Sequence, residues 1–144
     1  MSTAARRELP EGLQVTQRGS LVVVASTPAA EPSDAGEAWL VDAVANLVVA
    51  VREQTLEAPT PPSRLALVLH APRGRDAQER AVAAGLAGAV RGIAQSLALE
   101  LAPATCVNAV LCDALEDAEP TLALLADADG GFATGAAIDL RTVA

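Results

Sequence analysis

The stretch RLALVLHAPRGRDAQERAVAAGLAGAVRGIAQSLALELAPATCVNAV, residues 64–110, decides the fold. It opens with a nearly continuous apolar run at residues 64–70, which is typical of a strand buried on both faces of a parallel sheet. Residues 76–101 then predict one long helix that Pro103 ends, and residues 105–112 predict another strand. A strand, a helix and a strand in this order predict a parallel pair joined by a right-handed crossover.

The segments on either side extend this order to strand, helix, strand, helix, strand, helix and strand. The run SLVVVAS at residues 20–26 predicts a further strand that is buried on both faces. Apolar side chains at three- and four-residue steps predict a helix over residues 37–57, which the following prolines end. A short helix is expected over residues 116–127, and a last strand over residues 136–143.

This order predicts an α/β domain over residues 20–144, with a truncated Rossmann-like parallel sheet of about four strands and flanking helices. Residues 1–19 are expected to form a polar N-terminal tail, in which the alternation at residues 13–17 is compatible with a short strand. Cys106 and Cys112 lie in one predicted strand, too far apart along it to bridge each other, so both are expected to be free thiols.

The charge composition excludes several classes of function. The net charge is −8, and nucleic acids and anionic membranes require clustered positive charge, so neither is expected as a partner. All ten basic residues are arginine, and the chain contains no lysine and no tyrosine. A lysine base, a Schiff base and a tyrosine proton donor are therefore excluded.

The apolar segments are expected to belong to a cytoplasmic protein. No uninterrupted apolar run reaches the ~18 to 20 residues of a membrane helix. The first twelve residues contain no apolar segment of the kind that a signal peptide has.

Small residues recur at three- and four-residue steps along the long predicted helix. Each glycine inside a helix costs about 1 kcal/mol relative to alanine, so three of them need a structural reason. Close approach of another helix, or of the sheet, would supply that reason, and the sequence leaves both open. We call this set the small-residue stripe: Ala81, Gly85, Gly88, Gly92 and Ser96.

Four segments resemble the second half of a short-chain dehydrogenase/reductase of ketoreductase type. WLVDAVANL at residues 39–47 resembles the family's W-x6-N-L helix, and AVRGIAQSLALELAP at 89–103 resembles its A-V-x-G-L-x-x-S-L-A-x-E-L-A-P helix. VNAV at 107–110 resembles the R-V-N-A-V strand, and ATG at 133–135 resembles the turn before the last strand. The resemblance covers residues 20–144 and implies the fourth to seventh strands of that fold.

The resemblance also implies that the family's chemistry is lost. The family uses an Asn, a Ser and a Tyr-x3-Lys pair. Asn46 matches the Asn, but His70 stands at the Ser position, and Ala83 and Ala87 stand at the Tyr and Lys positions. No Gly-rich dinucleotide turn can be placed before residue 21. We therefore expect a pseudoenzyme with no catalytic residues, no cofactor and no metal.

In this family the two long helices form a four-helix bundle between subunits. The resemblance thus implies a homo- or hetero-oligomer, in which this chain stabilises a full-length, active reductase of acyl or polyketide metabolism. The strand at residues 21–25 would be left as an edge, for residues 13–17 or another chain to cover. The expected interface consists of Trp39, Val44, Val48, Ala81, Gly85, Gly88, Gly92 and Ser96.

An alternative function uses the carboxyl edge of the sheet, where open α/β sheets bind ligands. His70, the only histidine, and Asn46, with Asp113 as a third candidate, would then bind a small ligand or retain some enzymatic activity. Against this, His70 has no paired motif around it and is better explained as a partly exposed histidine at a loop edge. Asn46 is better explained as a hydrogen-bonding residue inside a helix than as a catalytic remnant, because the partners of such a remnant are missing.

Overall fold

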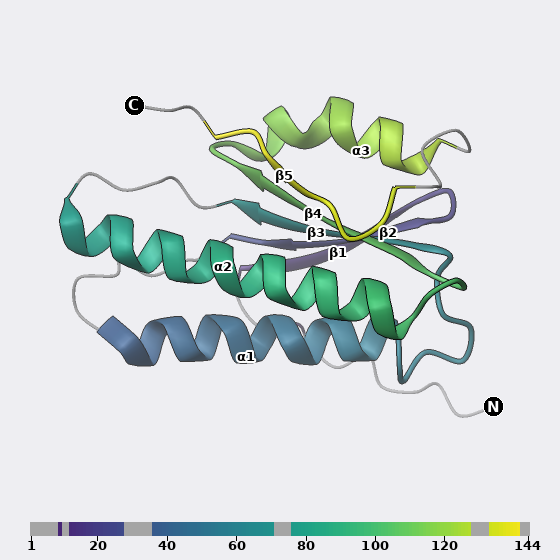
Figure 1. Ribbon diagram of the computed structural model, residues 1–144, viewed down its shortest axis with the longest axis horizontal. Coiled ribbons are helices and arrows are strands. Elements are labelled where there is room, and N and C mark those ends of the chain that lie inside the picture. Colours follow the sequence, from purple (N-terminus) through teal and green to yellow (C-terminus); the bar gives the residue numbers. More distant parts are fainter. Residues whose placement is uncertain (1–8, 10–11, 28–35, 71–75, 128–132, 142–144) are drawn as a thin grey trace.

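A computed structural model describes residue 9 and residues 12–27, 36–70, 76–127 and 133–141; side chains are not described for residues 36–40. The chain alternates strands and helices after a first β-hairpin (Figure 1). The elements are β1 (Leu13–Arg18), β2 (Leu21–Ser26), α1 (Gly36–Gln54), β3 (Arg64–His70), α2 (Ala77–Glu100), β4 (Cys106–Cys112), the 3-10 helix η1 (Leu115–Ala118), α3 (Glu119–Ala126) and β5 (Ala137–Asp139).

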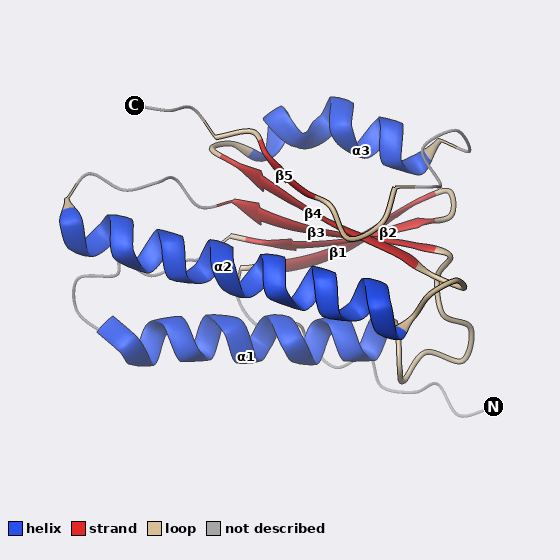
Figure 2. Cartoon of the chain, in the orientation of Figure 1, coloured by secondary structure: helices blue, strands red, loops and turns tan. Residues whose placement is uncertain are grey.

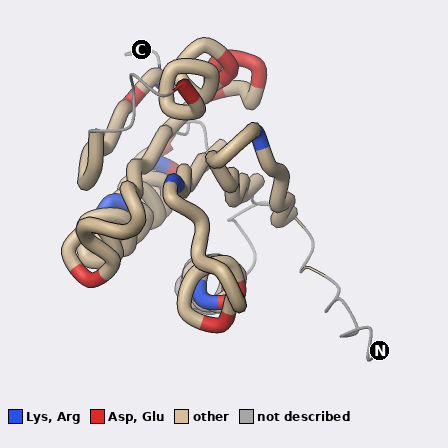
Figure 3. The backbone as a smooth tube through the Cα atoms, turned by 90° about the vertical axis from the view of Figure 1, so that its right-hand side faces the viewer, with Lys and Arg blue, Asp and Glu red and all other residues tan. Residues whose placement is uncertain are grey.

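One five-stranded sheet organises the described residues. Its strand order is β1-β2-β3-β4-β5, and the pairs from β2 to β5 are all parallel. Helices α1 and α2 lie side by side on one face, and α3 covers the other (Figure 2). The edge-on view separates the same three layers (Figure 3). The expected α/β class with a parallel sheet of four strands is confirmed, and an antiparallel fifth strand is added to it.

Strand β1 supplies the added strand by folding back along β2. The two strands pair antiparallel from Leu13 opposite Ser26 to Arg18 opposite Leu21. The connecting loop has only two residues, and Gly19 adopts φ 58°, a conformation that glycine enters without steric cost. Residues 13–18 therefore do form a strand, and they cover the edge of β2. One edge strand of the sheet is therefore β1, and the other is β5.

Two apolar clusters, one on each face of the sheet, stabilise the layers. The first lies between the sheet and the α1/α2 pair and includes Leu47, Leu67 and Val90, each at most 1% exposed. The second lies under α3 and includes Val68 and Leu122. Side chains of β3 and β4 enter both clusters, which is why their sequences are continuous apolar runs and do not alternate.

Three predicted boundaries were wrong. The first helix ends at Gln54: the Thr55 amide is shared between the Val51 and Arg52 carbonyl oxygens, and the Glu57 amide donates to the Arg52 carbonyl oxygen at 3.0 Å, so the regular i−4 ladder stops there. The segment at 116–127 starts as η1 and becomes α3 only at Glu119. Within the described part of the predicted strand at 136–143, only Ala137–Asp139 pair, because the neighbouring β4 ends one residue after the partner of Asp139; residues 142 and 143 lie outside the described residues.

Helix α2 begins where the sequence predicts. Asp76 caps it by accepting a hydrogen bond from the Glu79 amide at 2.8 Å. Among the described residues, α2 is the one helix long and apolar enough to cross a membrane by length and composition, a property that core helices of water-soluble proteins share. Here one side of α2 packs on the sheet through Leu86, Val90 and Ala94.

Candidate functional site

The small-residue stripe lies on the side of α2 that faces away from the sheet. All five of its residues are exposed, whereas Ala83, Leu86, Ala87, Val90, Ala94 and Ala98 are the buried residues of the helix. At 3.6 residues per turn, the stripe and the buried residues point in nearly opposite directions. Of the two explanations that the sequence leaves open, contact with the sheet is therefore wrong.

Space is open above the glycines of the stripe. A Cβ atom placed on Gly88 or on Gly92 would meet no heavy atom within 4 Å. Neither residue has a positive φ, so the backbone conformation does not require glycine either. Each still costs about 1 kcal/mol relative to alanine at an exposed position of a helix. No contact among the described residues explains why glycine stands at these positions.

Helix α1 continues this surface beside α2. Val41 and Val48 are 63% and 38% exposed, and Leu99 of α2 is 82% exposed. A groove of about 430 Å3 runs between the two helices, and its lining is almost entirely apolar. Its lining residues are Val44, Val48, Val51, Arg52, Ala89, Gly92, Ile93, Ser96 and Leu97.

We call the apolar and small residues on this side of α1 and α2 the helix face. The one charged residue that lines the groove, Arg52, lies at the end of α1 and forms an ion pair with Glu57 at 3.6 Å. Of the eight expected interface residues, seven lie on this surface, and the side chain of Trp39 falls outside the described part of the structure. The helix face consists of Val41, Val44, Val48, Ala81, Gly85, Gly88, Ala89, Gly92, Ile93, Ser96 and Leu99.

The carboxyl edge of the sheet is the other candidate site. His70 ends β3 and is half-buried, and its Nδ1 atom is buried without a hydrogen-bond partner in the described structure. Asn46 is exposed on α1, and no hydrogen bond between it and His70 is seen in the described residues. Ala83 and Ala87 are buried on the sheet side of α2. The positions matched to the family's catalytic residues are therefore not assembled into one polar site.

Cys112 does not supply a nucleophile at this edge. Burial and the nearby carboxylates of Asp117, Asp113 and Glu116 raise the pKa of the Cys112 thiol. Because the thiolate is the reactive form, this environment disfavours reaction of the buried thiol at neutral pH. Both cysteines are free, as expected. The described residues hold no cluster of three His, Cys, Asp or Glu side chains that could bind a metal ion.

Three polar residues that the sequence analysis did not single out have structural roles. Asn108 is 4% exposed in β4; its amide donates to the Ala133 carbonyl at 2.8 Å and accepts from the Ala136 amide at 3.1 Å. Thr134 accepts from the Val107 amide at 3.1 Å. Arg64 donates to the carbonyl oxygens at the end of α3. The role of Asn108 could have been predicted, because an asparagine inside an otherwise apolar strand needs hydrogen-bond partners.

Comparison with known proteins adds no relative. No protein-family model matches the chain, and no curated protein matches it. The resemblance to short-chain dehydrogenases/reductases therefore rests on its four segments, and the functional argument rests on the helix face and the carboxyl edge.

Proposed function

We propose that this protein is a non-catalytic, short-chain-dehydrogenase-like subunit that binds and stabilises an active reductase. The partner is a ketoreductase-type enzyme of acyl or polyketide metabolism, and the contact is made by the helix face. The complex is a helix bundle in which α1 and α2 pack against two helices of the partner. The subunit acts in the cytoplasm, and no membrane, nucleic acid or cofactor takes part.

The observation that carries this proposal is the open space above Gly88 and Gly92. Glycine at an exposed helix position lowers stability, and it brings a benefit where another backbone approaches closely. The valines of α1 support the same conclusion, because Val41 and Val48 would be covered by the same partner helices. An apolar groove between exposed helices is a common site for a partner helix to dock.

The composition and the buried alanines support a role without catalysis. Neither Ala83 nor Ala87 can donate or hold a proton, and the chain has no tyrosine or lysine elsewhere to replace them. The Asn46 side chain lies on an exposed part of α1, where it can contribute to solvation or to a protein contact.

Native mass spectrometry of the protein purified from its own host, without overexpression, tests this proposal. A mixed complex with a reductase of about 250 residues, the size of one full α/β domain, is the expected result. A Gly88→Leu variant should lose the partner, because a leucine side chain would fill the space where the partner helix packs. An Ala123→Leu variant, altered at an exposed position of α3 on the other face of the sheet, is the matched control. Recovery of the chain without a reductase would contradict the proposal.

A small-ligand site at the carboxyl edge remains the second candidate function. The buried Nδ1 atom of His70, which no described residue hydrogen-bonds, favours it, because a polar ligand could satisfy that atom. A saturable ligand titration that His70→Ala abolishes would support this function. Asn46→Ala should weaken the same binding only if both residues contact the ligand.

A further inference from the structure

The outer edge of β1 carries backbone groups that no described residue satisfies. The Thr27 amide donates to the Gly12 carbonyl at 2.7 Å, which fixes the phase of the antiparallel ladder. Hydrogen-bonded and non-hydrogen-bonded pairs alternate along such a ladder. The N–H and C=O groups of Gln14, Thr16 and Arg18 therefore point toward β2. The N–H and C=O groups of Leu13, Val15 and Gln17 point away from the sheet, and we call these three the outward residues.

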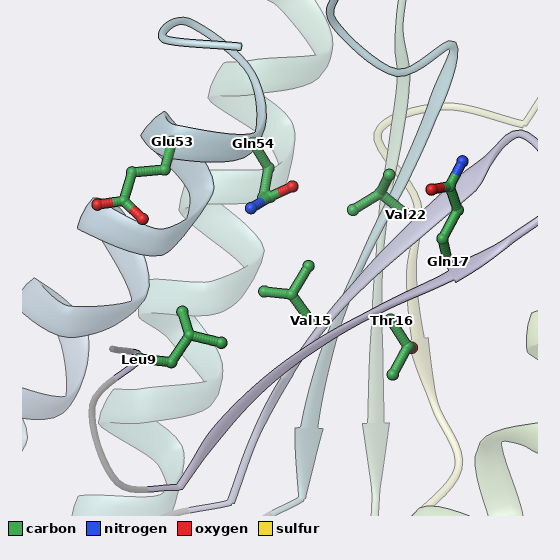
Figure 4. Close-up of a pocket in the computed structure, with 7 residues that line it drawn as sticks. All are labelled: Leu9, Val15, Thr16, Gln17, Val22, Glu53 and Gln54. Atoms are coloured by element: carbon green, nitrogen blue, oxygen red, sulfur yellow. The ribbon is translucent and has the colours of Figure 1, made fainter. Parts of the chain in front are cut away.

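A pocket of about 450 Å3 lies beside this edge (Figure 4). Val15 points from β1 toward α1, and the side chains of Leu9 and Gln54 lie around it. The pocket leaves room next to the outward residues for the side chains of an added strand. Its lining residues are Leu9, Val15, Thr16, Gln17, Val22, Glu53 and Gln54.

We propose that β1 is a second interaction surface, at which two copies of this chain pair their β1 strands antiparallel. Outward groups spaced two residues apart are complementary to an extended backbone and to no compact ligand. A two-fold axis beside Val15 places Val15 opposite its own copy and Leu13 opposite Gln17 of that copy. All outward residues then face outward residues, so each can donate and accept a hydrogen bond across the axis.

The charge pattern favours a second copy as the occupant. β1 contains no acidic residue and no proline, and its one charged residue is Arg18, although the chain carries a net charge of −8. Edge strands that avoid self-association usually carry lysine, proline or inward charges, and β1 has none of these. In the proposed register Arg18 lies opposite Gly12 of the other copy. The two Arg18 side chains are then about 20 Å apart, beyond the ~8 Å screening length.

Helix α1 supports the same arrangement. It packs over β2, whereas α2 packs over β3 and β4, so the flank of α1 away from α2 faces the β1 edge. Val49, which is 44% exposed, lies on that flank, one turn before the pocket residue Glu53. Pairing of two β1 strands would make one continuous sheet with both copies of α1 on the same face. Part of the exposed surface of Val49 would then be covered.

A charge-pair design tests this interface without touching the core. Gln14 and Thr16 are exposed and would lie opposite each other across the axis. The double variant Gln14→Glu/Thr16→Glu should raise the dimer dissociation constant about tenfold or more, because two like-charged cross-strand pairs form. Gln14→Lys/Thr16→Lys should have the same effect. An equimolar mixture of both variants should recover the dimer, and sedimentation velocity measures all four samples.

Amide hydrogen exchange gives a second readout at the level of single residues. In the dimer the amides of Val15 and Gln17 should exchange about tenfold or more slowly, and this protection should vanish on dilution. A Val15→Pro variant removes an outward N–H and no bond within the chain, and should be a folded monomer.

Three outcomes would overturn this inference. In the first, Val15 and Gln17 exchange rapidly at every concentration. In the second, they are protected in a monomer, as they would be if residues 1–8 of the same chain cover the edge. In the third, a dimer forms that Gly88→Leu disrupts and the charge variants leave intact, which assigns it to the helix face. The proposed pairing of β1 strands is supported if Gly88→Leu releases the partner protein but leaves the dimer intact, while the β1 variants break the dimer but retain the partner.

Discussion

Replacing Gly88 and Gly92 by alanine should stabilise this protein while weakening its contact with a partner. Each added methyl group enters open space, so no steric cost opposes it. Each replacement removes about 1 kcal/mol of backbone entropy cost from an exposed helix position. The double variant should therefore gain about 2 kcal/mol in free energy of unfolding.

The expected shift in melting temperature follows from the size of the chain. Unfolding entropy is about 2.1 cal/mol/K per residue, which gives about 0.3 kcal/mol/K for 144 residues. A gain of about 2 kcal/mol should then raise the midpoint by about 7 °C, as measured by circular dichroism on dilute protein. Ala84→Gly, at an exposed position of the same helix, is the opposite control and should lower the midpoint by about 3 °C.

The two halves of this prediction can fail separately. An unchanged midpoint for Gly88→Ala/Gly92→Ala would mean that these positions are covered or constrained in the isolated protein, against the geometry of α2. A raised midpoint with undiminished recovery of the partner in native mass spectrometry would mean that the glycines serve no close helix contact. The helix face would then need another explanation.

Three further predictions concern the core and its titration. Asn108→Ala should cost about 2 to 4 kcal/mol in urea unfolding, because two part-buried backbone groups lose the partner that the buried Asn108 side chain supplies. Exposed Asn46→Ala should change stability by less than about 0.5 kcal/mol. Cys112 should resist thiol reagents at neutral pH in the folded protein and react after denaturation. Because the pKa of Cys112 is raised in the folded protein, the thiol's contribution to stability is complete below about pH 8.5, where the unfolded thiol is also neutral, and it falls as the pH rises further, until the folded thiol ionises as well. Cys112→Ala should therefore reduce the fall in unfolding free energy with pH above about pH 8.5. An equal fall in the variant would refute the assignment of this pH dependence to Cys112.

The sequence determined the layers of this protein. Continuous apolar runs in β2, β3 and β4 specified strands buried on both faces, and the period of α1 and α2 specified helices that cover them. These signals are local, so they can be read without knowing the fold. The sequence also established that no tyrosine or lysine is available for catalysis, since composition does not depend on structure.

Only the tertiary structure decided which surfaces remain open. The glycine spacing in α2 was the same whether the stripe faced the sheet or solvent, because rotation of a helix about its axis is set by packing. The direction of β1 and its place at the sheet edge depended on its register with β2. The short strand β5 gave the poorest boundaries, because its ends are set by hydrogen bonds to β4 and not by its own sequence.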